Sequence, residues 1–262
     1  MTMFRFILGQ LRRRGIYVFR NGMPWGASLP RDLQTLPAFP ATPVIFDVGA
    51  NVGQTLMEVK NAWPKAIVHC FEPTPESFKL LSQAAAKLCD VTCHEIALSS
   101  KGGTAVLTRG DVSVLNQVKP IELTCVSSVG VMERTCVRLS TVGSMCQDAN
   151  IAHIDLLKID TEGHDLQVLM GAERLLNKHA IDFVLTEVGF GDDARFCLDI
   201  EIRDYMMRFG YRLLGVYGQS PAIDQWNRSH VPPYYANMLF IRPHYFSADV
   251  HASYIADTSY VE

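Results

Sequence analysis

From residue 44 onward, short apolar segments alternate with segments of helical periodicity, and this alternation restricts the chain to folds built on a parallel β-sheet. Strands are predicted at 44–48, 66–71, 91–98, 154–160, 182–188, 211–217 and 237–242. Helices are predicted at 52–61, at 75–88, from 165 onward, and from 198 to 209. This order predicts a doubly wound α/β fold around a seven-stranded, mostly parallel sheet.

The alternation is interrupted between residues 102 and 139, where short strands are predicted at 104–107, 113–115 and 135–139. We interpret this segment as a β insertion between the third and fourth strands of the sheet. The length of 262 residues and the hydrophobic content of 48% are typical of one large domain with an insertion or a terminal extension. We therefore expect a basic N-terminal extension at 1–40 and a single domain at 41–262.

Charge is distributed unevenly along the chain. Residues 1–40 contain six basic residues and one acidic residue, so they carry +5 and the remaining residues carry −8 of the total of −3. The acidic body argues against a nucleic-acid partner. The basic segment at 1–20 has several open interpretations: a helix packed over the domain, a lid, an oligomer contact, a docking segment for an acidic or lipid-linked acceptor, or peripheral contact with an anionic membrane.

Neither a membrane-spanning segment nor a cysteine-based zinc site is predicted. No stretch approaches the ~18 apolar residues of a spanning helix, and the first residues do not follow the pattern of a secretory signal. The seven cysteines form no C-x-x-C pair, so buried thiols in a reducing compartment are expected. We therefore expect a cytoplasmic protein.

The most informative local motif is a strand, a glycine turn and a helix start at 44–53. Gly49 allows the backbone to pass close to a ligand, and Gly53 allows the helix and the strand to approach each other. In open α/β sheets, ligands bind beyond the carboxyl ends of the strands, which places a ligand site here. The G-x-x-x-G spacing differs from the G-x-G-x-x-G of nicotinamide enzymes, and this argues against a dehydrogenase.

Two carboxylates indicate the class of ligand. Asp47 lies two residues before the glycine turn, where it would repel a pyrophosphate but suit a cation. Glu72 ends the second strand, ~20 positions beyond the glycines, where an acid can accept both ribose hydroxyls. Together they predict a positively charged nucleoside without phosphates, and S-adenosylmethionine fits. The structural alternative makes Asp47 a helix cap and Glu72 a surface residue at a turn.

A second motif, LLKIDTEGHD at 156–165, brings Asp160, Glu162 and His164 to the end of the fourth strand, and Glu187 ends the next strand. Methyl transfer to a hydroxyl needs alignment of the acceptor and removal of its proton, which an Asp, Glu or His can perform. Alternatively, Asp160, Glu162 and Glu187 could hold a divalent cation that acidifies the hydroxyl. In the structural alternative, Asp165 caps the helix, Lys158 pairs with a carboxylate, and His164 is a surface residue.

At these residues the sequence resembles the FkbM family of S-adenosylmethionine-dependent methyltransferases. The resemblance covers about residues 40–242. The matching motifs are IFDVGANVGQ at 45–54, FEPTPESF at 71–78, IALS at 96–99, KIDTEGHD at 158–165, VLMGA at 168–172, TEV at 186–188 and ANMLF at 236–240. Two positions depart from the family pattern: Ser140 follows Leu139 where an acid is usual, and Asp165 replaces a glutamate.

The resemblance implies a class I methyltransferase fold with strand order 3-2-1-4-5-7-6, the last strand antiparallel. It also implies O-methylation of a small-molecule, natural-product or glycan hydroxyl, with S-adenosylhomocysteine as the product. The cofactor-binding residues it implies are Asp47, Gly49, Asn51, Gly53, Glu72, Ala97, Ser113 and Asp160, and the catalytic candidates are Asp160, Glu162, His164 and Glu187.

Other functional classes remain open at this point. One is a metal-assisted, catechol-type O-methyltransferase that uses a divalent ion. Another is a relative that binds the cofactor without catalysing a reaction, although the intact carboxylates at both strand ends argue against it. A nucleic-acid methyltransferase is disfavoured by the acidic body of the chain.

Overall fold

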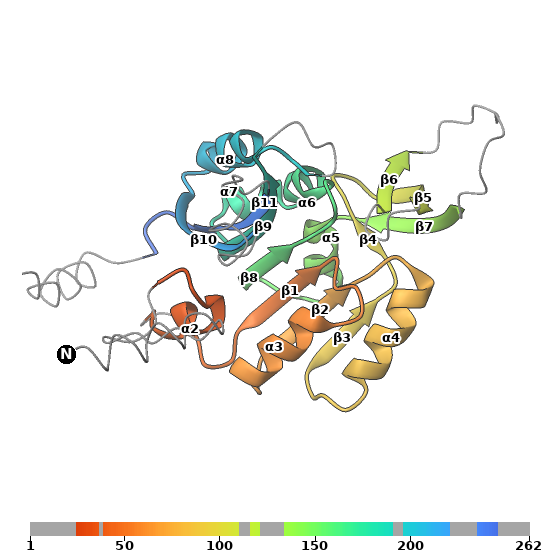
Figure 1. The fold of residues 1–262 in the computed structure, drawn as a ribbon, viewed down its shortest axis with the longest axis horizontal. Coiled ribbons are helices and arrows are strands. Elements are labelled where there is room, and N and C mark those ends of the chain that lie inside the picture. Colours follow the sequence, from red (N-terminus) through yellow and green to blue (C-terminus); the bar gives the residue numbers. More distant parts are fainter. Residues whose placement is uncertain are drawn as a thin grey trace, which may run out of the picture.

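Seven strands form the central sheet in the order β10-β11-β9-β8-β1-β2-β3 (Figure 1). The computed structural model describes residues 25–36, 39–109, 116–120, 134–190, 196–220 and 235–245. The strands are β1 (Val44–Val48), β2 (Ile67–Phe71), β3 (Val91–His94), β8 (Ile154–Ile159), β9 (Ile181–Gly189), β10 (Arg212–Ser220) and β11 (Tyr235–Ile241).

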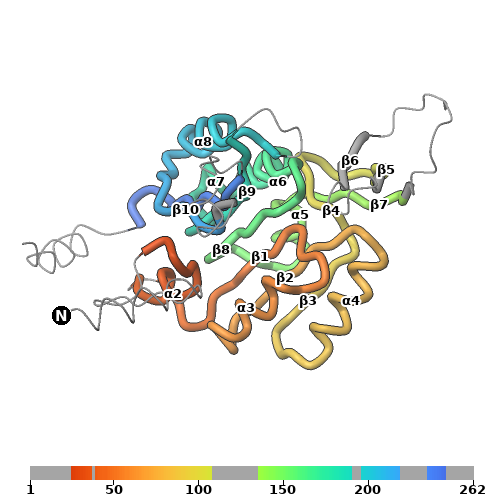
Figure 2. The backbone as a smooth tube through the Cα atoms, viewed as in Figure 1, coloured from red at the N-terminus to blue at the C-terminus, as the bar shows by residue number. Residues whose placement is uncertain are grey.

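The pairing of these strands confirms the predicted fold class. β2, β1, β8 and β9 pair in parallel, whereas β11 runs antiparallel to both of its neighbours, β9 and β10. If the seven strands are numbered by their order in the chain, their order across the sheet is 3-2-1-4-5-7-6, and the seventh strand, β11, is antiparallel. β1 and β8 are far apart in the sequence but lie side by side at the centre, as the tube in Figure 2 shows. Their carboxyl ends therefore meet at one edge.

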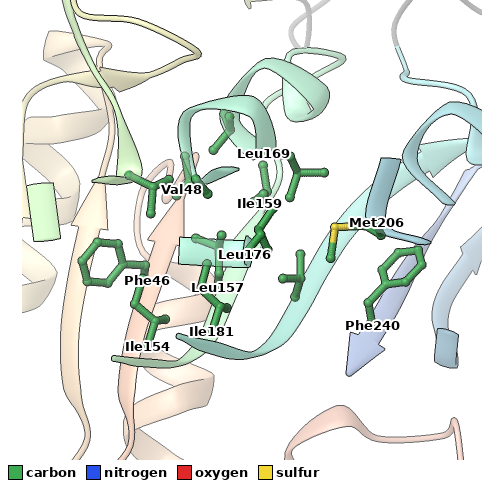
Figure 3. Packing of buried hydrophobic residues seen from close by; sticks show 14 of the residues in the cluster. Phe46, Val48, Ile154, Leu157, Ile159, Leu169, Leu176, Ile181, Met206 and Phe240 are labelled. Atoms are coloured by element: carbon green, nitrogen blue, oxygen red, sulfur yellow. The ribbon is translucent and has the colours of Figure 1, made fainter. Parts of the chain in front are cut away.

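Helices cover both faces of the sheet. On one face, α2 (Leu29–Gln34), α3 (Gln54–Ala62) and α4 (Pro75–Ala85) bury Leu33, Leu56 and Leu81. On the other face, α5 (Val142–Asp148), α6 (Asp165–Gly171), α7 (Glu173–Asn177) and α8 (Asp199–Arg208) pack on the sheet. Figure 3 shows Met206 from α8 beside Phe240 of β11, and Leu157 near Phe46. The central strands are therefore buried on both sides, which explains their nearly continuous apolar runs.

A second sheet, in the order β4-β7-β5-β6, stands beside the first (Figure 1). Its strands are β4 (Ala97–Leu98), β5 (Gly103–Arg109), β6 (Asn116–Pro120) and β7 (Arg134–Ser140). The prediction of one strand over 91–98 was wrong, because the chain leaves the main sheet after β3, and Ala97 and Leu98 pair with Leu139 and Ser140 instead. The predicted strand at 113–115 lies outside the described residues.

Helix boundaries differ from the predictions by a few residues, and one predicted helix is divided. The apolar face that begins at Asp165 is shared by α6 and α7, which meet at Ala172. The basic segment at 1–20 also lies outside the described residues. Within the described part of the chain, no helix has both the length and the apolar character needed to cross a bilayer.

Candidate active site

A cavity of about 310 Å³ lies at the carboxyl edge of the main sheet. The ends of β1, β2 and β8 form its floor, and the second sheet contributes Ala97, Leu98 and Leu107 to its wall. Its polar lining comprises Asn51, Gln54, Thr55, Glu72, Thr74, Ser77, Lys158, Asp160, Thr161, Glu162 and His164. The predicted ligand site and this cavity therefore coincide.

The glycine turn after β1 holds three strand ends together. Gly49 has a φ of 79°, and its amide donates to the carbonyl of Phe71 over 3.0 Å. A Cβ atom at this position would lie 1.9 Å from the carbonyl oxygen of Asp160. Gly53, with a φ of 97°, precedes α3 and lies against Leu81. Only glycine allows β1 to approach β8 this closely at Gly49.

Glu72 is held by two backbone donors at the cavity wall. The amide of Asn51 donates to Oε2 over 3.0 Å, and the amide of Thr74 donates to Oε1 over 2.8 Å. Glu72 is 6% exposed, and burial raises the pKa of its carboxyl group although both hydrogen bonds oppose the shift. Because each carboxylate oxygen has two lone pairs, each retains acceptor capacity for a ligand hydroxyl.

Asp47 is fully buried and does not line the cavity. Lys158 occupies the register position beside it on β8, and its Nζ lies 3.0 Å from Asp47 Oδ1 and 3.4 Å from Asp160 Oδ2. Lys158 does line the cavity. The pairing of Lys158 with a carboxylate, predicted as the structural alternative, is thus confirmed. Asp47 does not line the cavity itself but contacts Lys158, which does.

The loop that follows β8 presents three of the predicted side chains to the cavity: Asp160, Glu162 and His164. Glu162 has a φ of 55°, an unusual conformation for a residue other than glycine. His164 Nε2 lies 3.0 Å from Ser99 Oγ, and burial lowers the pKa of the imidazole. A neutral imidazole with one ring nitrogen already engaged suits a group that orients an acceptor or takes its proton.

Asp165 fixes this loop from behind. Its Oδ2 accepts a hydrogen bond from Thr161 Oγ1 over 2.9 Å, and its Oδ1 accepts one from Thr186 Oγ1 over 3.1 Å. Asp165 is 1% exposed, and burial raises the pKa of its carboxyl group to about 6. The loop after β8 is therefore anchored to the end of β9.

Glu187 follows Thr186 and lies beside the same acidic group, although it is not part of the cavity wall. Burial and the charges of Asp160, Asp165 and Glu162 together raise the pKa of Glu187 to about 8, although the charge of Lys158 opposes the shift. The end of β9 thus holds a carboxyl group that changes protonation state near neutral pH.

The predicted metal ligands Asp160, Glu162 and Glu187 do not form a cluster of ligand atoms. Among the described residues, the one set of three potential ligands within 4.8 Å of one another is His153, Asp155 and Asp182. This set lies at the amino ends of β8 and β9, away from the cavity. A metal-assisted reaction stays a prediction without support from this arrangement.

The structure thus brings Gly49, Asn51, Glu72, Ala97, Asp160, Glu162 and His164 together around one cavity, with Asp47, Gly53 and Glu187 behind or beside it. Ser113 lies outside the described residues. Sequence reasoning missed the contributions of Ser99 and Leu107. The signal for Lys158 was its position in the last residues of the predicted strand at 154–160, two residues before Asp160.

Comparisons with known proteins identify the family to which the chain belongs. A family model described as "Methyltransferase FkbM domain" matches residues 47–213. The chain is 26% identical over 153 residues to the hexuronic acid methyltransferase AglP of Haloferax volcanii, covering 58% of each protein. It is 26% identical over 155 residues to the 2-O-methyltransferase NoeI of Sinorhizobium fredii, covering 55% of this chain and 63% of NoeI. The chain therefore spans about three fifths of the length of these curated relatives.

A solved structure supports the same fold. The crystal structure of a methyltransferase FkbM from Methylobacillus flagellatus superimposes with a TM-score of 0.51 at 14% sequence identity. The match covers 78% of this chain and 45% of that protein. The architecture described above is accordingly the class I, Rossmann-like methyltransferase fold.

Proposed function

This chain belongs to the FkbM family of methyltransferases, and on that basis we propose that it transfers a methyl group from S-adenosylmethionine to a hydroxyl group of a small-molecule, natural-product or glycan acceptor. The names of two relatives support this acceptor class, since one refers to a hexuronic acid and the other to a 2-O position. When bound, S-adenosylmethionine supplies an electrophilic methyl group on a sulfonium.

The observation that carries the proposal is the geometry of Glu72. Its two oxygens are fixed by the amides of Asn51 and Thr74 at the cavity wall, and they retain lone pairs for two further donors. The two hydroxyls of a ribose are such a pair of donors. The surrounding carboxylates of Asp160 and Glu162 disfavour a dinucleotide, because they would repel its pyrophosphate.

The chain's own residues supply orientation and proton removal. Asp160, Glu162 and His164 line the cavity from the loop after β8, and Glu187 lies near the end of the next strand, β9. We assign to this group the alignment of the acceptor hydroxyl and the acceptance of its proton. Because Glu187 has a pKa of about 8, it is a stronger base than an ordinary carboxylate once it is ionised.

Calorimetry with S-adenosylhomocysteine tests the cofactor. The wild-type protein is expected to bind it, and Glu72→Ala is expected to lose about 100-fold in affinity, as for two hydrogen bonds to a charged group. Glu173→Ala, which removes an exposed acid at the start of α7, serves as a control and should bind like the wild type. Absence of binding to the wild type, or equal binding by Glu72→Ala, would contradict the proposal.

Turnover measurements test the catalytic group. A panel of hydroxylated sugars and natural products is incubated with the protein and labelled S-adenosylmethionine. Single replacements Asp160→Asn, Glu162→Gln, His164→Gln and Glu187→Gln follow for any acceptor that is methylated. The assignment predicts that at least one replacement lowers kcat by 100-fold or more, the usual contribution of a general base. Full turnover in all four variants would remove the assignment.

A further inference from the structure

Two cysteines lie side by side on neighbouring strands of the main sheet. Cys70 of β2 and Cys93 of β3 are register partners in a parallel pair, and both are free thiols. Neighbouring strands lie about 4.8 Å apart, and register partners point to the same face of the sheet. The two Cα atoms of a disulfide usually lie about 4.4–6.8 Å apart. The strand pairing therefore places these two cysteines within reach of a disulfide bond.

The two thiols differ in exposure. Cys70 is fully buried in the hydrophobic cluster beneath α3 and α4, whereas Cys93 packs at the border of this cluster and is partly exposed. Within the described part of the chain, β3 is the edge strand of the main sheet and pairs with β2 alone. An edge strand can shift slightly against its single neighbour, which lets two sulfur atoms reach bonding distance. A small oxidant thus reaches Cys93 first, and Cys70 is in contact with it.

A hydrogen bond between the two thiols assigns their roles. Cys70 donates to Cys93, and this bond, burial and the negative charge of Asp47, its register partner on β1, raise the pKa of Cys70. The same hydrogen bond lowers the pKa of Cys93, although burial opposes the shift. The thiolate is the reactive form of a cysteine. Cys93 is therefore the sulfur that attacks an oxidant, and Cys70 is the thiol that resolves the product.

We propose that Cys70 and Cys93 form a redox-sensitive pair, which hydrogen peroxide joins in a disulfide bond between β2 and β3 and which a thiol reductant separates again. The Cys93 thiolate attacks one oxygen of the peroxide, the O–O bond breaks, and a sulfenic acid forms as hydroxide leaves. The sulfur of Cys70 then attacks the sulfenic sulfur, the S–O bond breaks, and the oxygen leaves as water with the Cys70 proton. Overall, two thiols are oxidised to a disulfide and one peroxide is reduced to two waters.

The disulfide is expected to act on the candidate active site through Glu72, which lies two residues after Cys70. The amide of Glu72 donates to the carbonyl of His94, the residue after Cys93, over 3.1 Å. A shift of β3 toward β2 should therefore displace Glu72 and weaken cofactor binding. Because Glu72 carries the proposed contact to the ribose, this consequence rests on the proposed function, whereas formation of the disulfide does not.

Peptide mapping tests the disulfide. The reduced full chain is treated with hydrogen peroxide, blocked with iodoacetamide and digested with trypsin without reduction. Trypsin places Cys70 in peptide 66–79, and Cys93 in peptide 88–101 together with the exposed Cys89. The variant Cys89→Ser removes this ambiguity and should still give the two peptides cross-linked, in a form that dithiothreitol separates. Cys93→Ser should give no such product.

Calorimetry with S-adenosylhomocysteine tests the consequence. Peroxide should lower the affinity of Cys89→Ser by about tenfold or more, as for loss of one hydrogen bond to a charged group, and dithiothreitol should restore it. Cys93→Ser and Cys70→Ala should bind equally before and after peroxide. Both variants also control for methionine oxidation, which dithiothreitol does not reverse. If Cys70→Ala fails to fold because it leaves a gap in the core, Cys93→Ser at the partly exposed position completes the test.

Each of three outcomes would contradict the inference. Absence of the cross-linked peptides, or a disulfide to a different cysteine, would overturn the redox pair. A disulfide without a change in affinity would overturn its link to Glu72. An equal loss of affinity in Cys93→Ser would assign the loss to other oxidised side chains. In all three, the reduced wild type still binds S-adenosylhomocysteine and the proposed cofactor stands. If the reduced wild type does not bind it, the proposed function fails, while the peptide map still decides the cysteine pair.

Discussion

The two ends of strands β8 and β9 carry similar side chains in different electrical environments. At the amino end, the Asp155 carboxylate accepts the amide of Val44 over 2.7 Å, and Asp182 pairs with the guanidinium of Arg242 and with His153. At the carboxyl end, the charges of Asp160, Asp165 and Glu162 act on Glu187, and Lys158, the cation that opposes them, is already paired with Asp47. At their amino ends, β8 and β9 therefore carry carboxylates whose negative charge is balanced by cationic and backbone partners. At their carboxyl ends, the same strands carry an excess of negative charge.

This difference separates a stabilising edge from a binding edge. Carboxylates that have cationic and backbone partners hold the ends of strands together. Burial, together with repulsion between neighbouring carboxylates, raises the pKa of Glu187, and groups with such raised values concentrate where a protein binds or reacts. A cationic ligand would relieve the repulsion at the carboxyl edge, whereas the amino edge already contains its own cation in Arg242.

The largest expected effect comes from Gly49→Ala, which breaks the carboxyl edge itself. The new Cβ would lie 1.9 Å from the carbonyl oxygen of Asp160, and the φ of 79° adds backbone strain. Overlap and strain together should cost about 3 kcal/mol or more. Thermal unfolding and S-adenosylhomocysteine binding measure the result. Gly102→Ala is the control, because its Cβ atom would lie 3.6 Å from the carbonyl oxygen of Leu139, an ordinary van der Waals distance. Equal stability of the two variants would contradict the prediction.

Arg242→Met tests the amino edge. The variant leaves the mostly buried Asp182 without its guanidinium partner, and loss of a charge-assisted hydrogen bond should cost about 1.5–3 kcal/mol at pH 7. Affinity for S-adenosylhomocysteine should not change. Denaturant unfolding and calorimetry check both statements. A matching loss of ligand affinity would mean that the two edges are not independent.

Thr186→Val tests the anchor between the two strand ends at the carboxyl edge. The change removes the hydroxyl that donates to Asp165 while it keeps the side-chain shape, at a cost of about 1–2 kcal/mol. Because Asp165 also holds Thr161, ligand affinity should fall several-fold. Thr186→Ser keeps the hydroxyl and should bind like the wild type. If Val and Ser behave alike in calorimetry, the hydrogen bond has no role in binding.

Glu187→Gln tests how the stability of the protein depends on pH at the carboxyl edge. The pKa of Glu187 is raised from 4.5 to about 8, so the folded protein holds a proton that the unfolded chain has released. The contribution of Glu187 to the stability of the wild type must therefore fall as the pH rises from 4.5 to about 8. The variant should lack this decrease and be the more stable protein at pH 8. Melting temperatures across this range provide the measurement, and parallel curves would contradict the raised pKa.

His153→Gln should give the smallest change in stability. Unlike Glu187→Gln, it should destabilise the protein. The hydrogen bond to Asp182 raises the pKa of His153 above 6.5, so its stabilisation is complete below 6.5 and disappears as the pH rises through the raised value. The variant should be less stable than the wild type at pH 5.5 and equal to it at pH 9. Because the side chain is 42% exposed, the difference should be ~0.2–1 kcal/mol. An equal difference at both pH values would exclude the titration.

The main sheet could be predicted from the sequence because its strands are buried on both faces and appear as continuous apolar runs. The break after β3 could not, since Ala97 and Leu98 are as apolar as a strand continuation would be. Their partners, Leu139 and Ser140, lie about 40 positions further along the chain, and local periodicity carries no information about such pairing.

The site was predicted unequally for a similar reason. Glycine turns and residues at strand ends are local features, and Gly49 and Glu72 lie where their spacing placed them. The pairing of Asp47 with Lys158 depends on the register between β1 and β8, which brings together residues more than 100 positions apart. The cluster of His153, Asp182 and Arg242 depends on three separate segments and gave no local signal.

Leu107 has a further consequence. It lies in the second sheet, yet it closes part of the cavity whose floor belongs to the main sheet. Floor and wall are therefore separate modules of the architecture. Substitutions, insertions or deletions in the second sheet can reshape the chamber while the strand register beneath it stays intact. Evolution and protein engineering alike can thus alter selectivity through the wall without rebuilding the cofactor platform.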